Sequence, residues 1–169
     1  AEIEASWAAM VEYLEIPLQG ELTPVLADRS MPGARWFPNT RTNYVSQIFK
    51  HASTERPALA FRNEVGARDE VSWARLERDV AALAQWLREQ GVQPGDRVVA
   101  YLPNIPQAVV AFLAVASVGA VWSLCSPEMG VAAVVDRFRQ IEPKVLFAVD
   151  GYRWSGKAHE SDKAESGSL

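Results

Sequence analysis

The sequence is poor in the residues on which several classes of protein depend. It has one cysteine, Cys125, which excludes a scaffold held together by disulfides. Its two histidines, His51 and His159, are far apart and lack the spacing of zinc ligands. A basic excess is also absent, because 21 Asp and Glu outnumber 17 Lys and Arg. The resulting net charge of −4 argues against a dedicated nucleic-acid-binding protein.

Charged residues are missing from a long internal stretch between Arg97 and Glu128. Within it, Gln107 to Ser126 contains no proline and has about the 20 residues that span a bilayer. Pro106 lies where a helix would begin and Gly119 where it would end, so the pattern favours a buried helix followed by a strand. No basic cluster flanks this stretch, and the N-terminus has no signal-peptide pattern. We therefore expect a cytoplasmic protein without a membrane span.

Apolar residues make up 49% of the 169 residues, which is too many for a disordered chain and enough for one domain. From residue 70 onward, strand and helix patterns alternate, with Ser72 as an N-cap and Gly91 as a helix-ending residue. This order predicts an α/β fold, with a mostly parallel sheet flanked by helices, to which strand 70–73 contributes. The expected strands are 58–62, 70–73, 97–102, 120–124 and 144–149, and the expected helices end near residues 90, 118 and 140.

The first 57 residues have a different character. Residues 1–20 contain an amphipathic helix pattern whose apolar stripe predicts that the helix packs on something. Residues 21–57 contain several prolines and are expected to be irregular, apart from a short helix over 44–52. The apolar stripe of the first helix consists of Ile3, Trp7, Met10, Val11 and Leu14.

One segment, Gly151 to Ala158, has the GxxxxGK spacing of a phosphate-binding loop and follows a strand. Such a loop continues with Ser or Thr, but here Ala158 follows Lys157, and no apolar stripe predicts the helix that must come next. We therefore expect no P-loop. Arg153 and Lys157 would instead form a basic loop at the carboxyl edge of the sheet, where open α/β sheets bind ligands.

Other catalytic motifs are absent. Neither the GxGxxG of dinucleotide-binding folds nor the GxSxG of nucleophile elbows occurs. Cys125 follows an apolar strand, and few histidines are present to serve as its base, so we interpret it as a core residue. The residues by themselves indicate a layered α/β domain with one basic loop.

Three segments carry more specific motifs. The first runs from Met31-Pro-Gly-Ala-Arg-Trp-Phe-Pro38 to Tyr44, and the second from Gly95-Asp-Arg-Val-Val-Ala-Tyr-Leu-Pro-Asn-Ile-Pro106 to Cys125-Ser-Pro127. The third runs from Asp136-Arg-Phe-Arg-Gln-Ile-Glu-Pro to Lys157. Together they resemble the N-terminal part of acetoacetyl-CoA synthetases, members of the acyl-adenylate-forming, acetyl-CoA synthetase-like superfamily. The resemblance covers roughly residues 26–157.

The resemblance implies the N-terminal subdomain of the large domain of an ATP-dependent acetoacetate–CoA ligase. Such enzymes use ATP, Mg²⁺ and CoA, and join acetoacetate or another short carboxylic acid to the CoA thiol through an acyl-adenylate. By the same resemblance, Arg153, Gly156 and Lys157 would contact CoA phosphates. The family's Ser/Thr/Gly-rich phosphate loop, followed by Pro-Lys, does not occur here. We therefore expect a truncated ligase with no catalytic residues, no tight cofactor binding and no activity alone.

The resemblance divides the chain into three parts. Residues 1–57 form an N-terminal helix and a wrapping segment, 58–157 an incomplete AMP-binding-type subdomain, and 158–169 a disordered tail or linker. Apolar surface left uncovered in such a piece would favour self-association. Two alternatives remain open at this point: a fragment of an acetyl- or propionyl-CoA synthetase, and a free-standing flavodoxin-like binding or interaction module.

Overall fold

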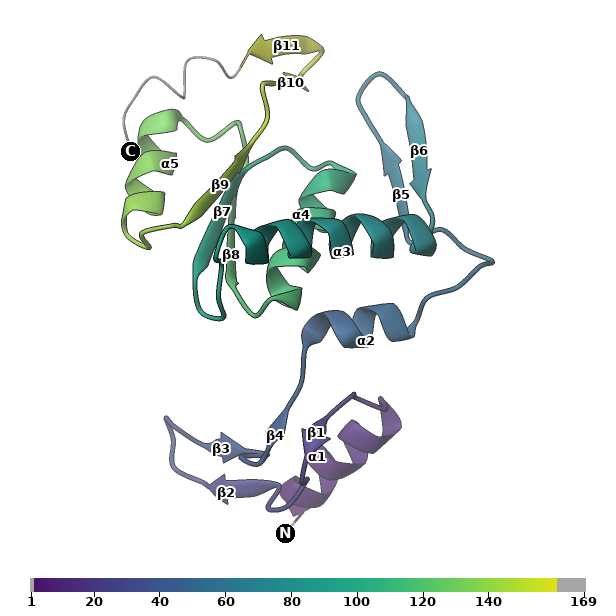
Figure 1. Ribbon diagram of the computed structural model, residues 1–169, viewed down its shortest axis with the longest axis vertical. Coiled ribbons are helices and arrows are strands. Elements are labelled where there is room, and N and C mark those ends of the chain that lie inside the picture. The colour runs from purple at the N-terminus through teal and green to yellow at the C-terminus, as the bar shows by residue number, and fades with distance from the viewer. Residues whose placement is uncertain (1, 161–169) are drawn as a thin grey trace. The chain divides into compact units, whose positions relative to one another are not determined.

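The structure is a computed structural model that describes residues 2–160 (Figure 1). The chain divides into two compact units between Lys50 and His51, and each is described by itself. The sequence predicted the corresponding boundary between residues 57 and 58. The elements of the first unit are α1 (Glu2–Tyr13), β1 (Gln19–Gly20), β2 (Leu26–Asp28), β3 (Arg35–Trp36), β4 (Thr40–Arg41) and α2 (Tyr44–Lys50).

The first unit contains the predicted amphipathic helix and two small antiparallel pairs. Strand β1 pairs with β4 and β2 pairs with β3, so the segment expected to be irregular holds short strands between its prolines. The ring of Trp7 on α1 contacts that of Trp36, with centroids 5.4 Å apart. No residue of α1 is buried, and the side chain of Met10 is 50% exposed. The predicted helix is therefore present, but its apolar stripe is only partly covered.

The second unit is built around a three-stranded parallel sheet with the order β8-β7-β9. Val98, Val99 and Ala100 of the central strand β7 have no exposed surface. The predicted α/β fold with a parallel sheet is confirmed. The elements of this unit are β5 (Leu59–Arg62), β6 (Arg68–Val71), α3 (Trp73–Glu89), β7 (Arg97–Tyr101), α4 (Pro106–Ser117), β8 (Val121–Cys125), α5 (Val131–Arg139), β9 (Val145–Ala148), β10 (Gly151–Trp154) and β11 (Lys157–Glu160).

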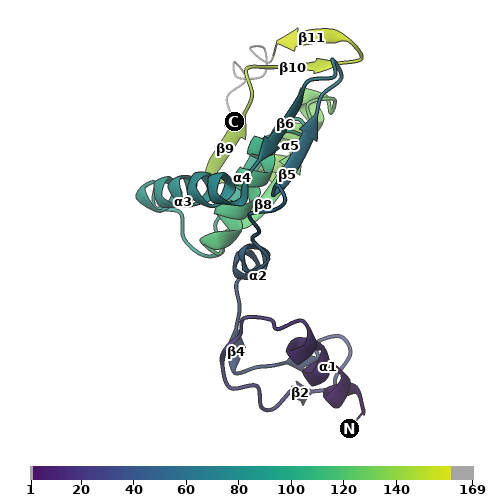
Figure 2. The same ribbon diagram turned by 90° about the vertical axis from the view of Figure 1, so that its right-hand side faces the viewer.

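Helices cover both faces of this sheet (Figures 1 and 2). On one face, Val134 and Phe138 of α5 pack against Val99. On the other face, Ala108 of α4 packs with Ala100 at the core. Helix α3 lies against α4. Side chains of β7 alternate between the two faces, as the pleat of a strand requires, so a nearly continuous apolar strand supplies both cores.

The helix boundaries follow from local signals that the sequence had identified. The Oγ of Ser72 accepts a hydrogen bond from the backbone N–H of Arg75 at 3.2 Å and caps α3. Gly91 and Gly119 follow α3 and α4 with φ of 75° and 76°, a conformation in which a side chain would be strained. Helix α4 has 12 residues, and in residues 2–160 no helix is long and apolar enough to cross a membrane.

Strand β6 was wrongly predicted to belong to the parallel sheet. It pairs antiparallel with β5, in register from Leu59 opposite Val71 to Arg62 opposite Arg68. The connection between the two strands is short and closed by Asn63, whose N–H donates to the carbonyl of Ala67 at 3.1 Å. A nearby partner joined by a tight turn costs little loop entropy, which favours this hairpin over pairing with a distant strand.

The end of the described chain is a second hairpin, formed by β10 and β11. Residues 158–160 were predicted to belong to a tail, but they form most of β11, because they complete the backbone hydrogen bonds of β10. Residues 161–169 lie outside the described residues. A strand rather than a helix follows the GxxxxGK segment, which confirms that the segment is not a P-loop.

Truncating Leu87, which has no exposed surface on α3, tests the core. The change Leu87→Ala should lower the free energy of unfolding by about 2–5 kcal/mol, because it removes buried contacts and leaves a cavity. The matched control Leu124→Ala changes a side chain that is 46% exposed and should cost less. Urea denaturation of both variants measures the difference, and equal losses would contradict this core.

Asp96 ties the turn before β7 to the start of β9. Its Oδ2 accepts hydrogen bonds from the N–H of Gln93 at 2.8 Å and from Nζ of Lys144 at 3.0 Å. The backbone bond, and then the lysine, hold the pKa of Asp96 below its usual value. The stabilisation is therefore present above the unfolded-state pKa, about 3.9, and is lost as pH falls through the lower folded-state pKa.

The variant Asp96→Asn tests whether the charge of Asp96 stabilises the fold, through the dependence of stability on pH. At pH 7 it should be less stable than the parent chain, because the amide cannot carry the charge that Lys144 contacts. The difference should shrink towards pH 3, where the parent carboxylate also begins to lose its charge. Urea denaturation at the two pH values measures it, and a difference that is the same at both would argue against the tie.

Candidate functional site

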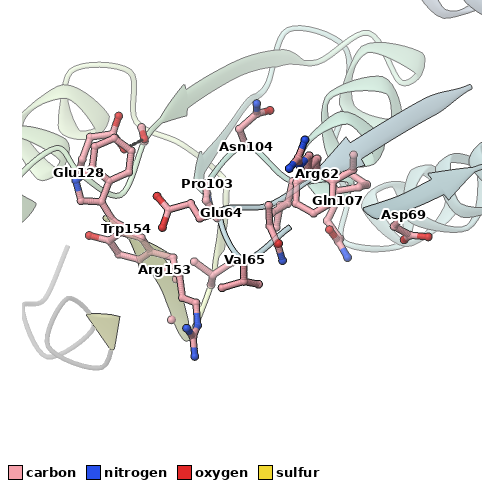
Figure 3. A pocket seen from close by; sticks show the side chains of 18 of the residues that line it. Arg62, Glu64, Val65, Asp69, Pro103, Asn104, Gln107, Glu128, Arg153 and Trp154 are labelled. Atoms are coloured by element: carbon pink, nitrogen blue, oxygen red, sulfur yellow. Dashed lines mark hydrogen bonds between the residues drawn. The ribbon is translucent and has the colours of Figure 1, made fainter. Parts of the chain in front are cut away.

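A cleft of about 710 Å³ opens at the carboxyl edge of the parallel sheet (Figure 3). Residues that follow β7, β8 and β9 line it, because the carboxyl ends of parallel strands meet at one edge. The hairpin of β5 and β6 and the strand β10 complete its walls. Charged side chains of both signs line the cleft: Arg62, Arg75 and Arg153 are basic, and Glu64, Asp69 and Glu128 are acidic.

Two tyrosine hydroxyls hold the loop after β8 in place. The hydroxyl of Tyr101 lies 2.8 Å from the carbonyl oxygen of Pro127 and 3.2 Å from that of Met129. Tyr152 on β10 donates to the same Pro127 carbonyl at 3.1 Å. Burial raises the pKa of Tyr101, so its hydroxyl stays a neutral donor. On the loop itself, the hydroxyl of Ser126 donates to the carboxylate of Glu128.

The three residues predicted to bind CoA occupy different places in the β10–β11 hairpin. Arg153 lines the cleft, whereas Gly156 and Lys157 do not. The register pairs Arg153 with Ala158 and Trp154 with Lys157. Because cross-strand partners share a face of a hairpin, Arg153 and Lys157 are on opposite faces. This arrangement therefore does not direct the Arg153 and Lys157 side chains to a single phosphate group.

Glu64 is a functional candidate that sequence reasoning missed. From the β5–β6 connection, its Oε1 accepts the N–H of Ser155 and its Oε2 accepts the N–H of Gly156, both at 3.0 Å. The bond from Gly156, then the bond from Ser155 and the charge of Arg153, lower the pKa of the Glu64 carboxyl. About ninety residues separate the partners in sequence, so no local signal could have pointed to this contact.

Cys125 and His159 each pack against neighbouring side chains in the described part of the chain. Cys125 is buried among Val99, Val134 and Phe138, which confirms its interpretation as a core residue. The ring of His159 stacks on that of Tyr152 with centroids 5.1 Å apart. Between residues 2 and 160, no group of three or more His, Cys, Asp or Glu side chains is arranged to hold a metal ion.

Comparisons with known proteins place the chain in a family and match its fold. The AMP-binding enzyme family matches residues 48–168, so this chain belongs to the AMP-binding enzyme family. Within it, the chain is similar to acetoacetyl-CoA synthetases, which confirms the resemblance predicted from its motifs.

Two curated relatives and one solved structure illustrate the similarity. The acetoacetyl-coenzyme A synthetase of Rhizobium meliloti is 41% identical over 96% of this chain and 25% of its own length. The acetoacetyl-CoA synthetase of Gallus gallus is 44% identical over 90% of this chain and 23% of its own. The structure of acetoacetyl-CoA synthetase from Streptomyces lividans superposes with a TM-score of 0.92, at 48% identity, over 96% of this chain and 26% of that one. This chain spans about a quarter of the length of these relatives.

Removing the Tyr101 hydroxyl tests how the loop after β8 is held. The change Tyr101→Phe leaves the Pro127 and Met129 carbonyls without this donor and should cost about 0.5–1.5 kcal/mol of stability. Thermal unfolding measures the loss. The control Tyr13→Phe, at a side chain that is 83% exposed, should be neutral, and a Tyr101 variant as stable as this control would contradict the assigned hydrogen bonds.

Proposed function

We propose that this chain is the N-terminal segment of an ATP-dependent acetoacetate–CoA ligase. Such an enzyme activates a carboxylate as an acyl-adenylate, and the CoA thiol then displaces AMP. Three observations support the proposal: membership of the AMP-binding enzyme family, relatives named acetoacetyl-CoA synthetases, and a strand-end cleft with basic side chains. Of these, the cleft is the observation that supports a binding role for this segment itself.

The role that we propose for this segment is to bind phosphate groups of CoA at the rim of the cleft. Arg153 is exposed, and a guanidinium can contact a phosphate through two parallel hydrogen bonds. CoA carries a 3′-phosphate as well as a diphosphate, so cations on opposite faces of the hairpin can serve different groups. Lys157 would then make a point contact to a phosphate other than the one held by Arg153. The Gly156 N–H already donates to Glu64, which limits its own part in phosphate binding.

The adenylation chemistry belongs, in this proposal, to parts of the enzyme outside this segment. The sequence has no Ser/Thr/Gly-rich loop followed by Pro-Lys. Among the described residues, no group of three or more His, Cys, Asp or Glu side chains is arranged to hold a metal ion. What this segment offers is the wall of a cleft with basic side chains, which would orient a substrate without reacting with it.

An exchange assay tests the division of labour. The purified chain should not support acetoacetate-dependent exchange between ATP and pyrophosphate, because it lacks the residues that bind the triphosphate. Incorporation of labelled pyrophosphate into ATP measures the activity. Exchange above a boiled-protein control would overturn the proposal that adenylation lies outside this segment.

A titration tests the proposed CoA contact directly. Adding millimolar CoA to the ¹⁵N-labelled chain should shift amide signals of the β10–β11 hairpin and the cleft rim. The variant Arg153→Gln should weaken this binding about threefold to tenfold, the worth of one charged hydrogen bond. The control Arg137→Gln, at an exposed cation on α5, should leave it unchanged.

Three outcomes of that titration would contradict the proposed role. The shifts could fall outside the hairpin and the cleft, the two arginine variants could behave alike, or CoA could cause no shifts. A parallel titration with 3′-dephospho-CoA separates the phosphates, since loss of the Arg153 effect would assign Arg153 to the 3′-phosphate. A saturable shift with FMN in place of CoA would favour the flavodoxin-like alternative.

A further inference from the structure

Hydrogen bonds hold the β10–β11 hairpin at its base and at its tip. At the base, the Tyr152 hydroxyl donates to the carbonyl of Pro127 at 3.1 Å. At the tip, the N–H groups of Ser155 and Gly156 donate to the two carboxylate oxygens of Glu64. Figure 2 shows the tip of the β5–β6 hairpin beside β10. A two-stranded hairpin has little stability by itself, so its orientation depends on such contacts.

Hydrogen bonds within the β5–β6 connection fix the backbone that carries Glu64, independently of its contact with the second hairpin. Its neighbour Asn63 closes the β5–β6 connection, because its Oδ1 accepts the N–H of Ala67 at 2.9 Å and its carbonyl accepts the N–H of Gly66 at 3.0 Å. The loop therefore keeps its shape without help from the Glu64 side chain. It presents the carboxylate from a fixed point beside the cleft, which Glu64 also lines (Figure 3).

The N–H groups that donate to Glu64 take no part in the pairing of β10 with β11. The pairing of β10 with β11 ends where Trp154 faces Lys157, and the two residues between them form the turn. Both turn residues have positive φ, 52° for Ser155 and 75° for Gly156, as in the tight turns that suit twisted hairpins. The pairing of β10 with β11 does not use the N–H groups of Ser155 and Gly156. These two N–H groups can therefore donate to the Glu64 carboxylate without breaking a bond between the strands.

We propose that Glu64 is the positioning residue for Arg153. By holding the turn at both N–H groups, it fixes the tip of the hairpin and keeps the Arg153 side chain at the rim of the cleft. Without Glu64, the tip is released and Arg153 must be ordered again each time an anion binds, which weakens binding. The hairpin anchor stands on geometry alone, whereas the anion, a phosphate of CoA, rests on the proposed function.

Amide hydrogen exchange in the intact chain tests the anchor. In Glu64→Ala, the amides of Ser155 and Gly156 should exchange at least about tenfold faster, because they lose their acceptor. In Glu64→Gln, the remaining amide oxygen can accept one of the two bonds, so the acceleration should be smaller. The control Glu70→Gln, an exposed acid on the same β5–β6 hairpin, should leave both amides unchanged. Exchange in Glu64→Ala that matches the parent chain would overturn the proposal.

A double-mutant cycle then tests whether Glu64 acts through Arg153. Glu64→Ala should weaken CoA binding about threefold in the parent chain but have no further effect in Arg153→Gln. An equal loss in both backgrounds would overturn the positioning role, because Glu64 would then act independently of Arg153. If Arg153→Gln leaves CoA binding intact while the turn amides still respond to Glu64, the proposed function fails and the hairpin anchor stands.

Discussion

The second unit depends on the burial of the three central residues of strand β7. Val98, Val99 and Ala100 have no exposed surface, so their backbone groups must be paired within the protein. Parallel strands on both edges, β8 and β9, supply that pairing. Parallel neighbours require crossover connections, and α4 and α5 provide them while covering opposite faces of the sheet. The same direction of all three strands brings their carboxyl ends to one edge, where the cleft lies.

The cleft lies between the ends of the parallel strands and two hairpins outside the parallel sheet. One wall consists of residues that follow the parallel strands, where the hydroxyls of Tyr101 and Tyr152 contact the loop after β8. The opposite wall consists of two hairpins that lie outside the parallel sheet and meet through Glu64. A ligand at the rim therefore meets strand ends on one side and, on the other, a hairpin that Tyr152 contacts at its base and Glu64 at its tip. We infer that affinity at this rim is set by how well the hairpins are held as much as by the cations that they carry.

The sequence predicted those features whose signals are local. Ser72, Gly91 and Gly119 mark helix ends through their own hydrogen bonds and backbone preferences, and the structure has them in those roles. Partner choice was harder, because a strand pattern does not say which strand lies beside it: β6 pairs in a hairpin and not in the sheet. The candidate site was predicted only in part. Arg153 lines the cleft, as a strand-end loop should. The register that places Lys157 on the other face of the hairpin and the contact of Glu64 with a distant segment have no local signal in the sequence.

A chimera with a solved relative tests whether this segment contributes to CoA binding in a working ligase. Residues of the Streptomyces lividans acetoacetyl-CoA synthetase that superpose on this chain would be replaced by it, and the KM for CoA measured in forming acetoacetyl-CoA. Our account predicts an active chimera in which Arg153→Gln raises the KM for CoA, while the KM values for ATP and acetoacetate stay the same. A folded chimera without ligase activity, or a KM for CoA that does not respond to Arg153→Gln, would contradict it.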